Sequence, residues 1–594
     1  MAGKNLSSNL SGNNAGSQSR PSAQTWLPLL SDVRNRSRSE VLQDVLAGTI
    51  TAILLVPQAL AYSLLAGLPP EVGLYASVIP PIIYALTGTS RTLAVGPVAV
   101  AAVMVAAALT PYAGGDPHKY LVGALILSAL SGLILLALGI LRLGWLTHFI
   151  SHPVLSGFTT GAAIFIVGTQ LAPLTGIYVP RDAGFVRIIE TLVVSSGDIN
   201  VVTTTFGLAA VLLLLLARGP LVRLLGKMGL KPSLAAVLGR TAPLVVVVLA
   251  IAVAGGLDVK SGWQVAVVGG VPQGLPGISL GFLVEPGWLA LLPSAALIAV
   301  IGYVESISVA KVLAFRRQQK INPDREFTAL GLTNVAAACA GAMPVAGGFA
   351  RSMVNFDAGA NTQLAAIITA CWVGLATFFF TGALADLPKA VLAAIIVVAV
   401  WQLIDFKGLR HTWTYDRGDG AAQGVTVVGV LTLGIEQGLM LGVGLAMVLF
   451  LYRTSRPHIA VVGRIAGTEH YRNILRHQVE TWPHLLLVRV DENIYFANTP
   501  RVESMLLDLV VDQAQLTDVV LVFSGVAYVD ASALEMLDEF ESALANRGVR
   551  LHLAEVKGPV MDRLQHTDLL ARLNGSRVHL STELAVAALT VPER

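Results

Sequence analysis

Long apolar runs recur between about residue 45 and residue 453, and they constrain the fold of this chain more than any other feature. An α-helix needs about 20 apolar residues to cross the hydrocarbon core of a bilayer. We therefore predict a polytopic α-helical membrane protein. Its fourteen candidate spans, two of them conspicuously short, are 45–66, 72–87, 95–111, 120–139, 147–173, 201–217, 242–256, 288–313, 327–342, 351–360, 363–381, 388–404, 421–434 and 437–453.

Charge is scarce and unevenly distributed. Only 13% of the residues are charged, roughly half of the about 25% found in soluble chains. Residues 470–594 hold 11 basic and 17 acidic side chains, whereas residues 1–469 hold 29 and 20. The basic surplus thus belongs to the apolar part, where membrane topology explains it, and we expect no nucleic-acid partner. Cys339 and Cys371 lie in apolar runs, so we expect no metal site and no cofactor.

Composition divides the chain into four segments. We expect a disordered leader at 1–25, a transmembrane domain at 26–456, a linker at 457–483 and a small α/β domain at 484–594. Twenty loop Lys and Arg residues fall on one side of the predicted spans and five on the other. Since positive loops stay inside, both termini should be cytoplasmic in a multi-pass protein of the cell membrane.

Two segments break the helical pattern inside apolar regions, at 90–97 and at 343–352. Each runs from an extended stretch into a short helix, and irregular backbone at membrane depth is kept only where it is buried or lines a cavity. A half-helix N-terminus presents free N–H donors and partial positive charge. Two such ends predict an inverted-repeat transporter with an anion site at the repeat interface. Two re-entrant loops or kinked structural helices are the alternative.

Two charged residues lie at membrane depth. A guanidinium there is costly unless it is paired or near water, so Arg351 is expected to attract an anion or to pair with an acidic residue. Glu305 is the only acidic residue of the 288–313 window. A buried carboxyl tends to keep its proton unless a cation offsets the desolvation, so Glu305 is a candidate proton carrier. A structural salt bridge to Arg351 or Lys311 is the alternative.

Polar groups also interrupt the first span. Gln58 follows Pro57, which interrupts helical hydrogen bonding, and its NH₂ group is a candidate substrate donor. Hydrogen bonding between helices is the alternative for such an amide. Tyr62 lies one turn later and either walls the same cavity or packs in the core.

The sequence resembles the sulfate permease (SulP), or solute carrier 26, family of anion transporters, from about Trp26 to the end of the chain. The resemblance rests on an ordered set of motifs: DVLAG at 44–48, VPQALAY at 56–62, GLPP at 67–70, GLY at 73–75, GTSR at 88–91, VGP at 95–97, INPDRE at 321–326, GLTN at 331–334 and FARSMVN at 349–355.

The resemblance implies fourteen spans in a seven-plus-seven inverted repeat, divided into a core domain and a gate domain. The anion would lie between the starts of the third and tenth spans, and the core would move like an elevator against the gate. The implied substrate-binding residues are Gln58 and Tyr62 on the first span, Val95, Gly96, Pro97 and Val98 on the third, and Phe349, Ala350, Arg351 and Ser352 on the tenth, with Glu305 on the eighth for proton coupling.

Two departures from the family pattern bear on mechanism. Several members have a hydroxyl residue where this chain has Ala350, which puts side-chain binding there in doubt and leaves the backbone N–H groups. Sodium-coupled bicarbonate members carry an acidic residue followed four positions later by a hydroxyl, whereas Glu305 is followed by Val309. Proton coupling through Glu305 is therefore the better expectation.

The expected function is secondary active transport of a small inorganic oxyanion, sulfate first, by proton symport. The alternatives are a bicarbonate or dicarboxylate transporter, or an anion exchanger or channel. From a different class, a membrane sensor would bind anions and signal through its tail. We expect no enzyme, because the chain has no nucleophile–base pair, no HExxH and no phosphate-binding loop with lysine.

The tail alternates predicted strands at 485–490, 519–523 and 549–554 with helices at 501–514 and 532–547. It resembles the STAS domain of sulfate transporters and anti-sigma-factor antagonists through VDASAL at 529–534. A serine at the position of Ser532 is phosphorylated in the antagonists, which makes it a candidate regulatory site. The alternative is a capping box formed by Ser532 and Glu535. We expect the tail to serve dimer contacts, trafficking or regulation, and the protein to form a homodimer.

Overall fold

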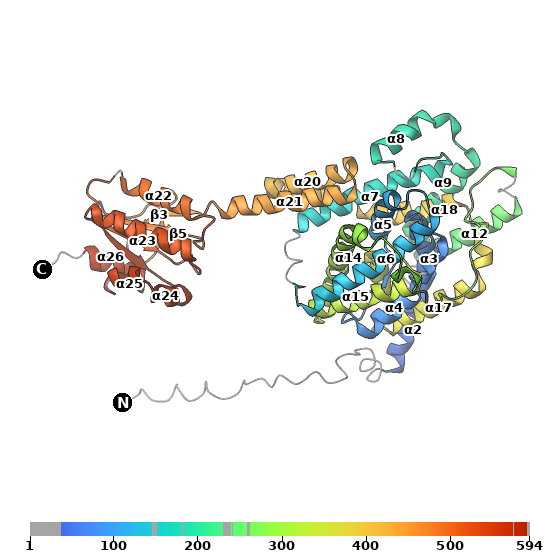
Figure 1. Ribbon diagram of the computed structural model, residues 1–594, viewed down its shortest axis with the longest axis horizontal. Coiled ribbons are helices and arrows are strands. Elements are labelled where there is room, and N and C mark those ends of the chain that lie inside the picture. Colours follow the sequence, from blue (N-terminus) through green and yellow to red (C-terminus); the bar gives the residue numbers. More distant parts are fainter. Residues whose placement is uncertain are drawn as a thin grey trace. The chain divides into compact units, whose positions relative to one another are not determined.

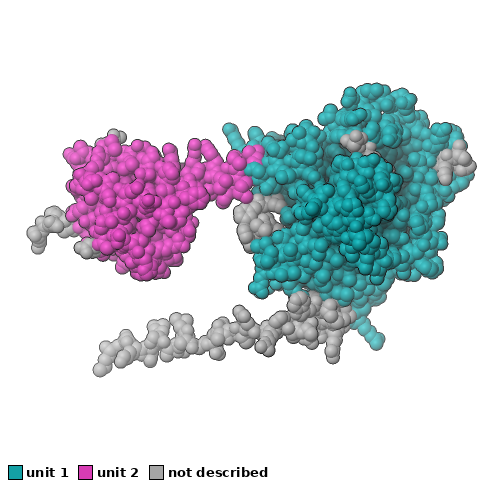
Figure 2. Space-filling model, in the orientation of Figure 1, with its two compact units in different colours: residues 1–444 teal, residues 445–594 magenta. Residues whose placement is uncertain are grey.

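The computed structural model describes residues 37–144, 151–180, 183–229, 239, 241–257, 262–511, 513–573 and 575–590. The chain divides into two compact units, Met1–Gly444 and Leu445–Arg594, which are coloured separately in Figure 2. The predicted leader at 1–25 lies outside the described residues. The division falls inside a long helix, so the linker expected at 457–483 is not where the units part.

The first unit is helical, and each of the fourteen apolar windows coincides with at least one helix (Figure 1). Its helices are α2 Arg38–Leu65, α3 Pro70–Tyr75, α4 Ile79–Thr87, α5 Ala99–Ala113, α6 Pro117–Ile140, α7 His152–Thr175, α8 Phe185–Val194, α9 Val201–Arg218, α10 Pro220–Lys227, α12 Ala242–Gly256, α14 Trp288–Arg316, α15 Pro323–Cys339, α16 Phe349–Asp357, α17 Leu364–Phe379, α18 Lys389–Val400, α19 Phe406–Tyr415, α20 Arg417–Thr432 and α21 Ile435–Thr454. Short 3₁₀ turns are η3 Ser196–Asp198, η4 Gly281–Leu283, η5 Thr381–Leu384 and η6 Trp401–Leu403.

Six helical segments within the described ranges are long and apolar enough to cross a membrane: Arg38–Leu65, Pro117–Ile140, His152–Thr175, Trp288–Arg316, Lys389–Tyr415 and Ile435–Thr454. Four more apolar helices are shorter, and the 72–87 window is divided between α3 and α4. A multi-pass helical membrane protein is therefore what the sequence encodes. The count of fourteen spans stays a prediction.

Local sequence explains where several of these helices begin. The Ser37 hydroxyl accepts from the Glu40 N–H, and the Glu40 carboxylate accepts from the Ser37 N–H, so a capping box starts α2. The Asp116 side chain caps α6 in the same position, and Pro117 takes the first helical position, where a missing N–H costs nothing. Polar caps of this kind fix helix starts that lie in loops.

The helices of the first unit pack in two groups. In one, α15 lies along α6 and α4, α14 packs against α6 and α5, and α17 packs against α2. Figure 1 shows α6, α14 and α15 side by side. In the other, α7 packs against α20, α18 and α9. The two groups meet where α18 contacts α2 and where α5 contacts α7.

The second unit contains a six-stranded sheet in the order β4-β3-β5-β6-β7-β8. Strands β5 to β8 are parallel, and β3 is antiparallel to both β4 and β5. Consecutive residues such as Leu486 and Leu487 point to opposite faces and enter separate cores, each against its own helices. The strands are β3 Ile459–Arg464, β4 Tyr471–Asn473, β5 Leu485–Val490, β6 Asp518–Val522, β7 Arg550–Ala554 and β8 Val578–His579, and the helices are α22 Thr499–Val511, α23 Ala531–Asn546, α24 Gly558–Leu564, α25 Asp568–Arg572 and α26 Thr582–Thr590.

Two sequence-based predictions for this unit are wrong. The linker expected at 457–483 contributes β3 and β4 to the sheet, because these strands complete its antiparallel edge. The capping box at Ser532 is also wrong, because α23 begins two residues earlier than that box requires. Asp530 is its N-cap and accepts from the Ala533 N–H at 2.9 Å, while Ser532 is exposed in the first turn. Capping therefore does not explain Ser532, and its regulatory role stays a prediction.

Candidate functional site

Two buried two-residue strands pair with each other inside the first unit, and we call this pair the crossing. β1 Val95–Gly96 pairs antiparallel with β2 Ala346–Gly347, with Val95 opposite Gly347 and Gly96 opposite Ala346. Each strand leads within two residues into a helix, β1 into α5 and β2 into α16. The two breaks predicted from the sequence therefore lie together, although about 250 residues separate them in the chain.

The helices that follow this crossing begin without side-chain caps. Val98 and Gly348 are their N-cap residues, and both have extended backbone conformations. The first intrahelical bonds are donated by the N–H groups of Ala102 and Ser352, each at 3.0 Å. The N–H groups of residues 99–101 and 349–351 consequently have no intrahelical acceptor, and both helix ends carry partial positive charge.

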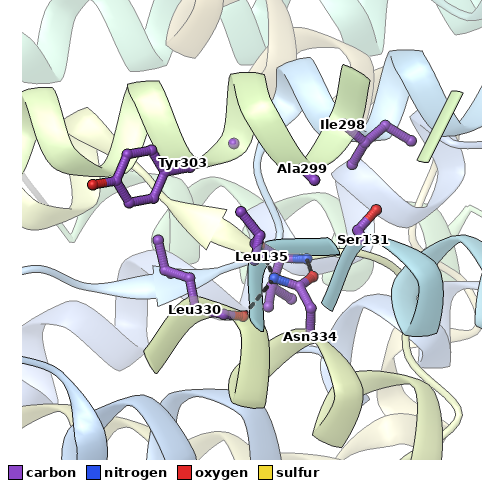
Figure 3. A pocket seen from close by; sticks show the side chains of 9 residues that line it. Ser131, Leu135, Ile298, Ala299, Tyr303, Leu330 and Asn334 are labelled. Atoms are coloured by element: carbon purple, nitrogen blue, oxygen red, sulfur yellow. Dashed lines mark hydrogen bonds between the residues drawn. The ribbon is translucent and has the colours of Figure 1, made fainter. Parts of the chain in front are cut away.

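Amide and hydroxyl side chains hold the second extended segment in place. Asn334 on α15 donates to the Leu330 and Val345 carbonyls and accepts from the Val345 N–H, at 2.9–3.0 Å (Figure 3). The Ser306 hydroxyl on α14 accepts from the Gly347 N–H at 2.7 Å. These contacts satisfy backbone groups that would find no water at this depth.

The first extended segment is supported in the same way. Gln363 donates to the Ser90 and Leu93 carbonyls at 2.6 and 3.0 Å, and Asn355 donates to the Thr92 carbonyl at 3.1 Å. Both amides come from the second half of the unit, so the first extended segment depends on distant helices for its backbone hydrogen bonds, whereas the second is held by helices of its own half.

Two buried carboxylates fasten the neighbouring loops. Glu326 accepts from the Tyr84 hydroxyl at 2.8 Å and from the N–H groups of Thr89 and Ser90 at 2.6 and 3.1 Å. Asp44 accepts from the N–H groups of Asn361 and Thr362 at 2.5 and 3.1 Å. Since several donors satisfy each carboxylate, these residues serve structure, and neither lines the cavity between the helix ends.

Arg351, in the first turn of α16, reaches back to the first crossing segment. It is 3% exposed; its Nε donates to the Ala94 carbonyl at 3.3 Å and its Nη1 to the Pro97 carbonyl at 3.2 Å. Its Nη2 is buried and has no hydrogen-bond partner among the described residues. One arm of a fixed, permanently charged guanidinium is therefore left for a ligand.

Two glycines leave room for this guanidinium. A Cβ atom at Gly96 would lie 3.2 Å from Arg351 Nη2 and 3.3 Å from Nη1 and Cζ. A Cβ at Gly348 would lie 3.3 Å from Nη2. A side chain at either position would push against Arg351, so the glycines are explained by close approach.

A cavity of about 50 Å³ lies at the two helix ends. A single buried water needs about 10–15 Å³ on the same measure, so this cavity has room for a larger species. Eight of the eleven residues predicted for binding or coupling line it: Gln58, Tyr62, Pro97, Val98, Glu305, Phe349, Ala350 and Arg351.

The other three predicted residues do not line the cavity. Val95 and Gly96 form β1, and the Ser352 hydroxyl accepts from the Ala94 N–H at 2.9 Å. They build the frame of the crossing, because a two-residue strand and its partner must bury their own backbone groups.

Glu305 and Gln58 face the cavity from α14 and α2. Glu305 forms no ion pair within 4.0 Å of Arg351 or Lys311, all three of which belong to the described residues, but it lies close enough to Arg351 for the two charges to attract each other. The helix α2 runs on through Pro57, contrary to the interruption expected there. A carboxyl and an amide thus share one small space with the guanidinium.

Sequence analysis missed the wall formed by the end of α18 and by η6. Ala399, Val400, Gln402 and Leu403 line the cavity there. The sequence hint was Gln402, a single amide at the end of the apolar 388–404 window. Nothing in the pattern of that window indicates that its end lies near the first helix.

Comparisons with known proteins identify the family of each unit. The sulfate permease family model matches residues 41–424, and the STAS domain model matches residues 476–585. This chain belongs to the sulfate permease family. Its membrane unit is followed by a STAS domain, and the family and its curated relatives are transporters and not enzymes.

Several relatives and solved structures cover most of the chain. Sulfate transporter 4.1 of Arabidopsis thaliana is 33% identical over 89% of this chain and 77% of its own length. A probable sulfate transporter of Mycobacterium tuberculosis is 32% identical over 95% of this chain and 98% of its own. The murine solute carrier 26 family member A9 anion transporter, in its inward-facing state, shares the fold with a TM-score of 0.88 at 21% identity, covering 97% and 96% of the two chains. The transmembrane domain of the cyanobacterial bicarbonate transporter BicA has a TM-score of 0.58 at 24% identity, covering 69% and 99%.

Proposed function

We propose that this protein is a secondary active transporter that takes up sulfate together with protons. The anion binds between the N-termini of α5 and α16, and the helices that carry this site move like an elevator against the group containing α7 and α18. The proposal includes the seven-plus-seven inverted repeat, a homodimer, a place in the cell membrane and cytoplasmic termini.

The observation that carries the proposal is the free arm of the Arg351 guanidinium. It lies buried beside a cavity at which two uncapped helix ends meet. A buried cation that no carboxylate contacts directly is costly unless a ligand supplies negative charge beside it. Backbone N–H groups and one guanidinium match a small oxyanion, because they offer several donors and no acceptor.

Glu305 is the group we assign to proton coupling. It lines the same cavity and has no ion pair among the described residues, whereas Glu326 accepts several hydrogen bonds. A carboxyl that is half-buried and unpaired can gain and lose a proton as an anion enters. Val309, four residues later, offers no oxygen ligand for sodium.

The test is uptake of radiolabelled sulfate into proteoliposomes, with and without an inward proton gradient. We expect uptake above that of protein-free vesicles, accumulation when the outside is acidic, and little accumulation without the gradient. No uptake of sulfate, bicarbonate or dicarboxylate under any gradient would contradict transport. Sulfate binding without flux would favour the anion sensor instead.

Glu305→Gln tests the coupling. Because glutamine cannot carry a proton, accumulation should no longer depend on the pH gradient, while sulfate binding measured at equilibrium should remain within about threefold of wild type. Asp44→Asn, which changes a carboxylate outside the cavity, is the matched control and should retain the pH dependence. Unchanged gradient-driven accumulation in Glu305→Gln would remove Glu305 from the mechanism.

A further inference from the structure

One wall of the cavity comes from the helix group that does not carry Arg351. It is formed by the last residues of α18 and by η6. This wall is fixed to the other helix group: α18 packs against α7 and α9, and η6 packs against α7. The Asp405 N–H, just beyond η6, donates to the Thr160 hydroxyl on α7 at 3.4 Å.

This wall offers an anion little besides Gln402. Ala399, Val400 and Leu403 are apolar, and Gln402, which is also exposed to solvent, is the one polar side chain that lines the cavity from here within the described residues. The backbone is that of a helix C-terminus, whose free groups are carbonyl acceptors that disfavour an anion. The side-chain NH₂ of Gln402 is therefore the hydrogen-bond donor available from this wall.

An oxyanion and a halide use such a donor differently. A tetrahedral oxyanion held by the helix N-termini and Arg351 still turns at least one oxygen away from them, toward the other walls of the cavity. An oxygen that faces an apolar surface without a donor is costly, whereas a spherical halide can move toward the guanidinium and leave the wall formed by α18 and η6 empty. A donor on that wall thus favours oxyanions over halides.

We propose that Gln402 is a substrate-contacting residue that makes the site prefer oxyanions over halides. This inference rests on the proposed anion site, and it adds a contact from the second helix group. Its amide completes the donor set around the oxyanion from the helix group that does not carry Arg351.

The experiment compares sulfate and chloride in wild-type, Gln402→Leu and Gln402→Glu proteins. Sulfate KM is measured by radiolabelled uptake into proteoliposomes, and chloride affinity by its inhibition constant in the same assay. A neutral hydrogen bond contributes about 0.5–1.5 kcal/mol, so Gln402→Leu should raise the sulfate KM about 3- to 10-fold while the chloride constant changes less than twofold. Gln402→Glu, which adds negative charge, should weaken both anions.

Trp401→Leu is the matched control, because Trp401 lies on the same turn, is 62% exposed and does not line the cavity. It should leave both constants unchanged. Equal loss of sulfate and chloride affinity in Gln402→Leu, or no loss of either, would overturn the assignment while leaving wild-type transport intact. Absence of wild-type sulfate transport would instead contradict the proposed function itself.

Discussion

The two helix starts at the cavity are alike in backbone and unlike in charge. Each follows a two-residue strand, lacks a side-chain cap and is reached through an extended segment held by amide side chains. The first turn of α5 is entirely apolar, whereas that of α16 contains Arg351 and Ser352. The two halves therefore supply equal backbone dipoles but only one cation.

Residues of both halves hold the single cation, Arg351, in place. Arg351 donates to the Ala94 and Pro97 carbonyls, and the Ala94 N–H donates to Ser352. The second half thus provides the charge, and the first half fixes its position. A site of this kind can present two similar helix ends while its charge rests on one side chain.

Removing the Arg351 side chain should have the largest effect, because it abolishes the difference in charge between the two helix starts. Arg351→Ala should lower sulfate affinity by about 10- to 100-fold, as expected for hydrogen bonds to a charged group worth about 1.5–3 kcal/mol. Equilibrium binding of radiolabelled sulfate to the purified protein measures this loss. Arg351→Lys keeps the positive charge but lacks the planar guanidinium with its several N–H donors, and it should recover part of the affinity. An unaltered affinity in Arg351→Ala would mean that the two helix dipoles suffice.

The glycines that contact the guanidinium sharpen the comparison between the halves. Gly96→Ala, in the first half, places a Cβ within 3.3 Å of three guanidinium atoms and should weaken sulfate binding by about fivefold or more, as overpacking costs about 1–3 kcal/mol. Gly348→Ala, in the second half, meets Nη2 at 3.3 Å and Cζ only at 3.6 Å, so about twofold is expected. The reverse order would contradict the assignment of positioning to the first half.

The amide supports should show the smallest difference between halves. Gln363→Leu and Asn334→Leu each remove hydrogen bonds from a buried crossing segment, at a cost of about 1–3 kcal/mol for unsatisfied groups. Thermal unfolding in detergent should shift downward by similar amounts in both variants. A loss confined to one variant would show that the two crossings are not supported equivalently.

Much of the fold followed from local patterns. Apolar windows located most helices of the first unit, though not α8, α10 and α19, and alternation located β5, β6 and β7. The edge strands β3 and β4 were missed, because they are short and are stabilised as strands only by pairing with β5 and with each other. Ser532 was misplaced in its helix because two capping residues, Asp530 and Ser532, compete within one turn.

The site was predictable where polar side chains occur inside apolar, membrane-spanning sequence. Arg351, Glu305 and Gln58 are polar residues in apolar windows, and all three line one cavity. Val95, Gly96 and Ser352 were expected to touch substrate but build the crossing instead, since strand pairing between distant segments is not visible in either segment alone. Gln402 was missed because only tertiary packing brings the end of α18 to α2.

The central claim is that the anion lies between the two helix ends against Arg351. Anomalous X-ray scattering from crystals of the protein grown with selenate, a heavier analogue of sulfate, tests it most directly. We expect a selenium peak inside the cavity, within hydrogen-bonding distance of the Arg351 guanidinium and facing the N–H groups that begin α5 and α16. A peak elsewhere, or an empty cavity at a selenate concentration that saturates binding to the same protein, would contradict the account.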